Sequence, residues 1–197
     1  MKFRGDTLVI DKALNDLDRL VLDVTEVLSA CGIQYATISG YVAVLLGRSR
    51  ATEDIDVIVS RFDTDTADEL ASRLKDTGFW GPNTPLDSMH ATLSDELPVR
   101  IARDGEIVPN VEIKFPTDEY DRTSLKETIT VQFDDRSLIV GSLELQIAYK
   151  LRLGTEKDFE DALYLYETTE GNLNTAQLEG YVEDLDVTDA YDRLKRA

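Results

Sequence analysis

The sequence predicts an α+β fold, in which a mixed β-sheet flanked by helices is followed by a C-terminal helical bundle. Short stretches of alternating apolar and polar residues end near residue 140. From Gly141 onward, apolar residues recur at about 3.6-residue intervals instead. Strands first and helices last are typical of a sheet-containing half followed by a helical half. We therefore expect a catalytic domain over residues 1–140 and a helical domain over residues 141–197, packed on the first.

The individual elements follow from the same periodicities and from turn residues. Asp11 is a candidate cap for a helix from about Lys12 to Ala30, and Asp104-Gly105 is a candidate tight turn between two strands. Residues 79–96 lack periodicity and read as a loop, and His90, the only histidine, is expected in this loop or at the edge of a short element. The predicted strands are residues 34–39, 55–60, 98–103, 110–115, 128–133 and 137–140. The predicted helices are residues 12–30, 41–47, 63–77, 175–184 and 188–195, with two more marked by Leu143, Ile147 and Leu151 and by Phe159, Ala162 and Tyr166.

The composition indicates a cytoplasmic protein that does not enter a membrane. Hydrophobic residues make up 42% of the 197 positions, without the long apolar run that a membrane span requires. The first residues, MKFRGDTLVIDKAL, carry scattered charges and no apolar signal segment. Cys31 is the only cysteine, so an internal disulfide is excluded.

The chain is strongly acidic, with 39 acidic against 21 basic residues and a net charge of −18. Asp outnumbers Glu by 24 to 15 and Arg outnumbers Lys by 13 to 8, and the acids are spread along the whole chain. This pattern is typical of a surface adapted to a high-salt cytoplasm, where counterions screen self-repulsion. Mimicry of nucleic acid is the alternative, but mimicry usually concentrates its charge. The net charge therefore does not exclude a nucleic-acid substrate.

The stretch from Tyr35 to Ser60 combines two features that suit phosphoryl chemistry. The predicted turn at Ser39-Gly40 leads into a short helix, where free backbone N–H groups can bind an anion. Asp54 and Asp56 share one face of the next strand, about 7 Å apart along it, and could converge on hard cations. In a chain with this many acids, such a pair can also be a plain solvated face.

The order of these elements resembles the nucleotidyltransferase fold of the DNA polymerase beta type. That family has a small-residue pair, a spacer, an acid-x-acid strand and a third acid, which here would be Glu112. The later segment GSLELQIAYKLRLGTEKDFEDALYL resembles AbiEii-like (type IV toxin) nucleotidyltransferases, in which a lysine-bearing helix precedes a Lys-Asp-x-x-Asp helix. The matches span about Ile33 to Leu165.

The resemblance implies a transfer of NMP from an NTP to a hydroxyl, with release of pyrophosphate. Asp54, Asp56 and Glu112 would hold two Mg²⁺ ions, and Lys150 would neutralise the triphosphate. It also implies roles near the nucleotide for a further group of residues, and Arg48 and Arg50 precede the acid pair closely enough to contact phosphate. This nucleotide-binding group consists of Ser39, Gly40, Arg48, Arg50, Lys157, Asp158 and Asp161.

The resemblance leaves the acceptor open: tRNA or another RNA, a protein, or a small molecule. It also allows a toxin with a partner antitoxin. A rival interpretation is a nucleotide-binding regulatory protein that has lost turnover, because Ser39 stands where glycine is usual and would be strained at φ > 0. A metal-dependent phosphohydrolase is disfavoured, because no histidine cluster completes such a site.

Several candidates also have plain structural interpretations. Glu112 beside Lys114 fits a surface charge pattern, and Lys157 with Asp161 fits a helix ion pair. Lys150 interrupts an apolar helix and could extend from its edge. Three tyrosines in this region are expected in the core rather than as base-stacking platforms: Tyr149, Tyr164 and Tyr166.

Overall fold

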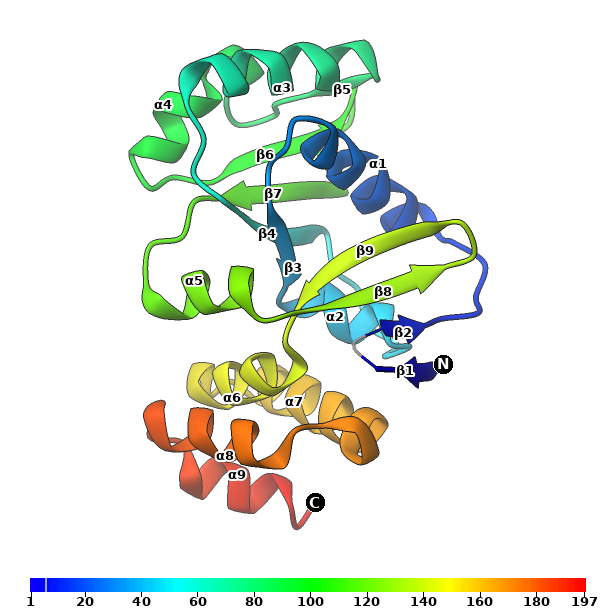
Figure 1. The fold of residues 1–197 in the computed structure, drawn as a ribbon, viewed down its shortest axis with the longest axis vertical. Helices are drawn as coiled ribbons and strands as arrows, with labels where there is room; N and C mark the ends of the chain where they lie inside the picture. The colour runs from blue at the N-terminus through cyan, green and yellow to red at the C-terminus, as the bar shows by residue number, and fades with distance from the viewer. Residues whose placement is uncertain (6) are drawn as a thin grey trace.

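A mixed sheet of nine strands runs through the computed structural model, which describes residues 1–5 and 7–197 (Figure 1). The order across the sheet is β1-β2-β8-β9-β3-β4-β7-β6-β5. The strands are β1 (Lys2–Arg4), β2 (Thr7–Val9), β3 (Tyr35–Ile38), β4 (Asp54–Val59), β5 (Phe79–Trp80), β6 (Val99–Arg103), β7 (Asn110–Lys114), β8 (Thr128–Phe133) and β9 (Arg136–Gly141).

Helices flank this sheet and follow it, which confirms the predicted fold class. In the part of the chain that the structure describes, they are α1 (Asp16–Ala30), α2 (Gly40–Leu45), α3 (Thr64–Asp76), α4 (Met89–Ser94), α5 (Glu119–Lys126), α6 (Leu143–Leu153), α7 (Glu156–Thr169), α8 (Thr175–Asp184) and α9 (Thr188–Leu194). The last four stack together below the sheet in Figure 1. The proposed division into domains at residue 140 stays a prediction.

The centre of the sheet is formed by β3, β4 and β7. β4 is antiparallel to β3 and parallel to β7. Ile55 and Val57 of β4 are fully buried, and α1 packs on the neighbouring strands through its apolar stripe. Because side chains alternate along a strand, Asp54 and Asp56 lie on the opposite face. On that face α5 packs against β3 and β4, and α6 follows β9 directly.

The start of α1 differs from the prediction. The helix begins at Asp16, and Asn15 rather than Asp11 is its cap. The Asn15 side chain accepts from the backbone N–H of Asp18 at 2.9 Å, and the Asp18 carboxylate accepts from the backbone N–H of Asn15 at 2.9 Å. This reciprocal capping box satisfies two N–H groups that the helix itself leaves free.

The predicted loop over residues 79–96 is also wrong, because it contains β5 and α4. His90 lies on α4, with Nε2 3.1 Å from the carbonyl oxygen of Phe62, and it does not line the cavity described below. The hairpin of β6 and β7 is confirmed, with its connection over residues 104–109 and a turn at Asp104-Gly105, where the N–H of Glu106 donates to the carbonyl oxygen of Arg103 at 2.9 Å. β1, β2 and α5 were not predicted.

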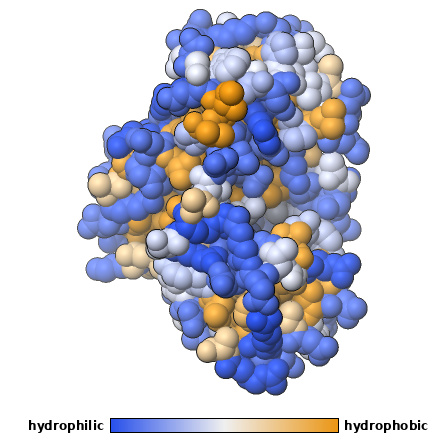
Figure 2. Space-filling view, turned by 180° about the vertical axis from the view of Figure 1, so that it is seen from behind, coloured by the Kyte–Doolittle hydropathy of each residue, from blue (hydrophilic) through white to orange (hydrophobic). Residues whose placement is uncertain are grey.

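Hydrophilic residues cover most of the face shown in Figure 2, with hydrophobic residues in small separate patches. This agrees with a chain in which 30% of the residues are charged. None of the helices described for residues 1–5 and 7–197 has the length and apolar character needed to cross a membrane.

Candidate active site

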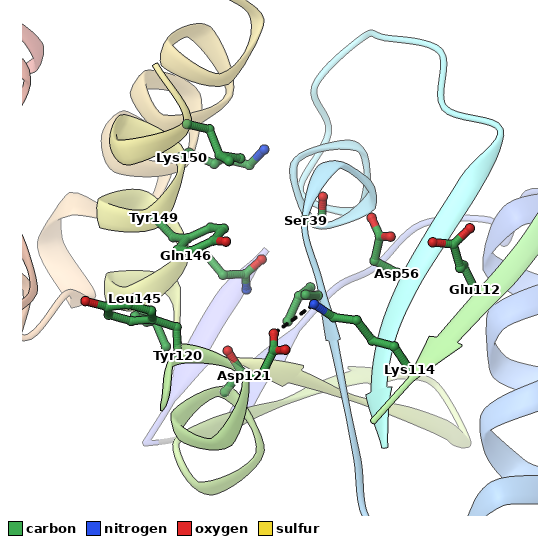
Figure 3. A pocket seen from close by; sticks show the side chains of 13 residues that line it. Ser39, Asp56, Glu112, Lys114, Tyr120, Asp121, Leu145, Gln146, Tyr149 and Lys150 are labelled. Carbon is green, nitrogen blue, oxygen red and sulfur yellow. Dashed lines mark ion pairs between the residues drawn. The ribbon is translucent and has the colours of Figure 1, made fainter. Parts of the chain in front are cut away.

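A cavity of about 230 Å³ lies between the polar face of the sheet and the helices α5 and α6 (Figure 3). On the sheet side it is lined by Ser39 at the end of β3, Asp56 on β4, and Glu112 and Lys114 on β7. On the helix side the lining comes from Tyr120, Asp121 and Ser124 of α5 and from Leu145, Gln146, Tyr149, Lys150 and Leu153 of α6. The cavity therefore joins segments that are far apart in the sequence.

Asp56 and Glu112 are direct neighbours across the parallel ladder of β4 and β7. Register neighbours point to the same face, and Figure 3 shows both carboxylates at the cavity. Burial raises the pKa of Asp56 above its ordinary value, and the negative charges of Glu112 and Asp54 raise it further. The nearby Ser39 hydroxyl acts in the opposite direction and lowers that pKa. Asp56 is thus a carboxylate for which a bound cation would relieve repulsion.

The other two predicted metal ligands have protein partners. Asn110 Nδ2 donates to Asp54 Oδ1 at 2.7 Å, and Asp54 does not line the cavity. Arg100 Nε donates to Glu112 Oε2 at 3.0 Å from the neighbouring strand β6. Within residues 1–5 and 7–197, no three His, Cys, Asp or Glu side chains are already arranged as a metal site. The three carboxylates of Asp54, Asp56 and Glu112 lie on the same face of the sheet, but they do not converge on one point.

Ser39 adopts a strained backbone conformation at its position between β3 and α2. Its φ is +68°, a region that residues with a Cβ rarely occupy. Such a conformation costs about 1–3 kcal/mol and persists where the surroundings hold it. Its hydroxyl lowers the pKa of the neighbouring Asp56, an effect that glycine could not supply.

Gly40 is buried and does not line the cavity. A Cβ at this position would lie 2.7 Å from Nη2 of Arg50, so the missing side chain makes room for the Arg50 guanidinium. Arg50 in turn pairs with Asp161 of α7. Gly40 therefore serves the packing of α2 against the C-terminal helices in this structure.

Lys150 belongs to a buried cluster of charges between α6, α7 and the segment after α2. Its Nζ lies 2.8 Å from Asp161 Oδ2 and 3.5 Å from Asp158 Oδ1. Arg48 and Arg50 also pair with Asp161, whose side chain is fully buried. Burial lowers the pKa of Lys150 to about 8, and the Asp158 charge opposes that shift.

The structure thus brings most of the predicted nucleotide-binding residues together around Lys150, but outside the lining of the cavity. Of that group only Ser39 lines it, together with the predicted catalytic Lys150. Lys157 is exposed, and its backbone carbonyl accepts a hydrogen bond of 3.4 Å from Arg48. Contacts of these residues with a nucleotide stay predictions.

Several cavity residues were not singled out from the sequence. Lys114 pairs with Asp121 at 2.9 Å, and Asp121 is held by the N–H and hydroxyl of Thr117, both at 3.0 Å. The position of Lys114, two residues after Glu112 on one strand, was the available signal. The expectation that Tyr149 is buried in the core is wrong, because it is 38% exposed and lines the cavity. Tyr164 and Tyr166 are partly buried and pack against the core.

Comparison with known proteins identifies the fold. The sequence matches no protein-family model and no curated protein. Among solved structures, it is similar to an antigenic nucleotidyltransferase-like protein from Paracoccidioides brasiliensis, with a TM-score of 0.54 and 20% identity over 91% of this chain and 92% of that one. JHP933 from Helicobacter pylori gives a TM-score of 0.47 and 16% identity over 92% and 78% of the two chains. A tRNA-processing enzyme gives a TM-score of 0.39 and 10% identity over 91% and 59%.

The first of these likenesses shows that the chain has a nucleotidyltransferase-like fold.

Proposed function

We propose that the protein is a Mg²⁺-dependent nucleotidyltransferase that moves an NMP from an NTP to a hydroxyl acceptor. The observation that carries this proposal is the pairing of Asp56 with Glu112 in register, beside the Ser39 hydroxyl and at the wall of a cavity. A fold of the nucleotidyltransferase type supports it.

The residues present fit magnesium by their chemistry. Asp54, Asp56 and Glu112 offer only carboxylate oxygens, which are the ligands that Mg²⁺ prefers. To bind a magnesium ion, Glu112 would release its hydrogen bond from Arg100, and Asp54 would release its hydrogen bond from Asn110. When bound, two magnesium ions would lower the pKa of the acceptor hydroxyl and neutralise the reacting phosphates. Asp56 is then the ligand whose charged form the Ser39 hydroxyl favours.

Lys150 supplies positive charge at the opposite wall of the cavity. Its Nζ is held by Asp161 and Asp158, and it lines the cavity from α6. A triphosphate in the cavity would compete with these carboxylates for the ammonium group. Arg48 and Arg50 stand behind it in the same cluster and are the other candidate phosphate contacts.

The choice of acceptor rests on resemblance. The likeness of residues 141–165 to AbiEii-like nucleotidyltransferases supports RNA, with a tRNA end as the first acceptor to test. The same likeness supports a toxin that is held by an antitoxin in the cytoplasm. A protein or small-molecule acceptor is the alternative.

Two observations favour a second candidate, a nucleotide-binding regulatory protein without turnover. Ser39 is strained, and the pairing of Glu112 with Arg100 leaves the carboxylates unconverged. Incubation with each α-labelled NTP, Mg²⁺ and total tRNA in high salt separates the candidates. Label transfer that Asp56→Ala abolishes supports the enzyme. NTP binding without transfer supports the regulatory protein, and release of phosphate from a γ-labelled NTP without transfer supports a phosphohydrolase.

A further inference from the structure

The wall of the cavity that faces the carboxylates is unusually apolar for this chain. Leu145, Tyr149 and Leu153 are spaced four residues apart on α6, so they form one face of that helix. Tyr149 is 38% exposed and Leu153 is 51% exposed, although only a few large apolar side chains are exposed in the described residues. The Tyr120 ring supports Tyr149 from α5, with the ring centroids 5.9 Å apart. An exposed, supported aromatic ring inside a cavity is suited to stacking against a planar ligand.

Gln146 adds a side-chain amide of fixed orientation to this wall. Its Nε2 donates to the carbonyl oxygen of Gly141 at 2.8 Å, which orients the amide. Its Oε1 is buried and has no hydrogen-bond partner among the residues that the structure describes. Figure 3 shows the amide directed into the cavity, beside Tyr149. Buried polar atoms are nearly always paired, so this oxygen calls for a donor that the chain itself does not provide.

The two lysines that line the cavity are already paired, which favours a neutral ligand part at the α6 wall. Lys114 is engaged by Asp121 at 2.9 Å, and Lys150 turns toward Asp161 and Asp158. Negative phosphates are therefore better placed at the Lys150 end of the cavity, near Ser39. A neutral, flat group with a hydrogen-bond donor fits between Tyr149 and Gln146.

We propose that Tyr149 and Gln146 bind the base of the NTP and select bases with an amino group at position 4 of a pyrimidine or position 6 of a purine, namely cytosine and adenine. Tyr149 stacks on the base, and Gln146 Oε1 accepts from the 4-amino or 6-amino group. Uracil and guanine present a carbonyl oxygen at the same corner, which would face the Gln146 oxygen and leave two acceptors unpaired. This specificity rests on the proposed function, because it assigns the base end of the nucleotide in the same cavity.

Equilibrium binding of the four NTPs to the full chain, with Mg²⁺ in high salt, tests the assignment. We expect CTP and ATP to bind about tenfold more tightly than UTP and GTP, since an acceptor without its donor rejects the wrong base. Gln146→Leu removes that preference, whereas Gln177→Leu on α8, outside the cavity, keeps it. Tyr149→Ala weakens all four NTPs by about tenfold through lost stacking.

A second measurement uses the unaltered protein, so its result does not depend on whether the variants fold. ATP is compared with the triphosphate of purine riboside, which lacks only the 6-amino group, and about tenfold weaker binding of the latter is expected. Equal binding of these two, or equal binding of all four NTPs, overturns the base assignment while leaving nucleotide transfer intact. Failure to bind any NTP contradicts the proposed function and this assignment together.

Discussion

Asp56 and Glu112 are paired in register on β4 and β7, and each is restrained by a different neighbour. Asp56 lies beside the Ser39 hydroxyl, which lowers its pKa, whereas Glu112 accepts from Arg100 on β6. The first contact favours the charged carboxylate beside a strained turn. The second contact occupies Glu112 Oε2 with the Arg100 guanidinium, and a metal ion would need that same oxygen. The readiness of the site to bind magnesium therefore depends on how strongly Arg100 holds Glu112.

Replacing Arg100 by Gln should strengthen Mg²⁺ binding. The Arg100 side chain is 42% exposed, so its pairing with Glu112 is screened, and we expect about two- to fivefold tighter binding. Isothermal titration with Mg²⁺ measures the change. Arg103→Gln is the matched control, because Arg103 is equally exposed but pairs with Asp23 of α1. Weaker Mg²⁺ binding by Arg100→Gln would show that Arg100 supports the site instead of competing for it.

Substitutions at Ser39 should separate backbone strain from the hydroxyl. Ser39→Gly relieves the positive φ, whereas Ser39→Ala keeps the strain, so we expect the glycine variant to be more stable by about 1 kcal/mol. Denaturant unfolding measures this difference. Both variants lose the hydroxyl that lowers the pKa of Asp56, so in both the acid limit of Mg²⁺ binding should move to higher pH. Equal stability of the two variants would contradict a strained Ser39.

NTP affinity should fall in mildly alkaline solution because of Lys150. Its pKa is lowered to about 8, so the protein without nucleotide loses this charge as the pH rises through that value. The triphosphate favours the protonated form, and the NTP dissociation constant should therefore rise by up to about tenfold per pH unit above pH 8. Lys150→Arg stays charged and should show a flat profile. A wild-type dissociation constant that stays constant from about pH 7 to 10 would exclude Lys150 from phosphate binding.

The sequence predicts the elements that have strong periodicity or turn residues. The strand over residues 128–133 and the helix over residues 175–184 agree with β8 and α8. α5 was missed because its buried residues, Asp121 and Ser124, are polar, so no apolar stripe marks it. β1 and β2 are too short for alternation to be visible. The start of α1 was misplaced because a reciprocal cap at Asn15 competes with the isolated Asp11.

Only part of the candidate site could be predicted, because spacing along the chain does not reveal contacts between distant segments. Alternation along the strands placed Asp54 and Asp56 on one face, and resemblance supplied Glu112 and Lys150. The partners of these residues come from other strands and helices, so Arg100, Asn110 and Asp161 could not be paired with them from spacing alone. The cavity-facing side of α6 was hidden because most residues of this helix are buried, which left Gln146 unmarked and Tyr149 assigned to the core.

The central claim is that Asp56 and Glu112 act as one unit in nucleotide transfer. Its most direct test is the rate of label transfer from the preferred α-labelled NTP by wild type, Asp56→Asn, Glu112→Gln and the double variant. We predict that each single variant loses about 10³-fold or more and that the double variant loses little beyond that, because residues acting together are not additive. Unchanged transfer in either single variant, or losses that simply multiply in the double variant, would contradict the claim.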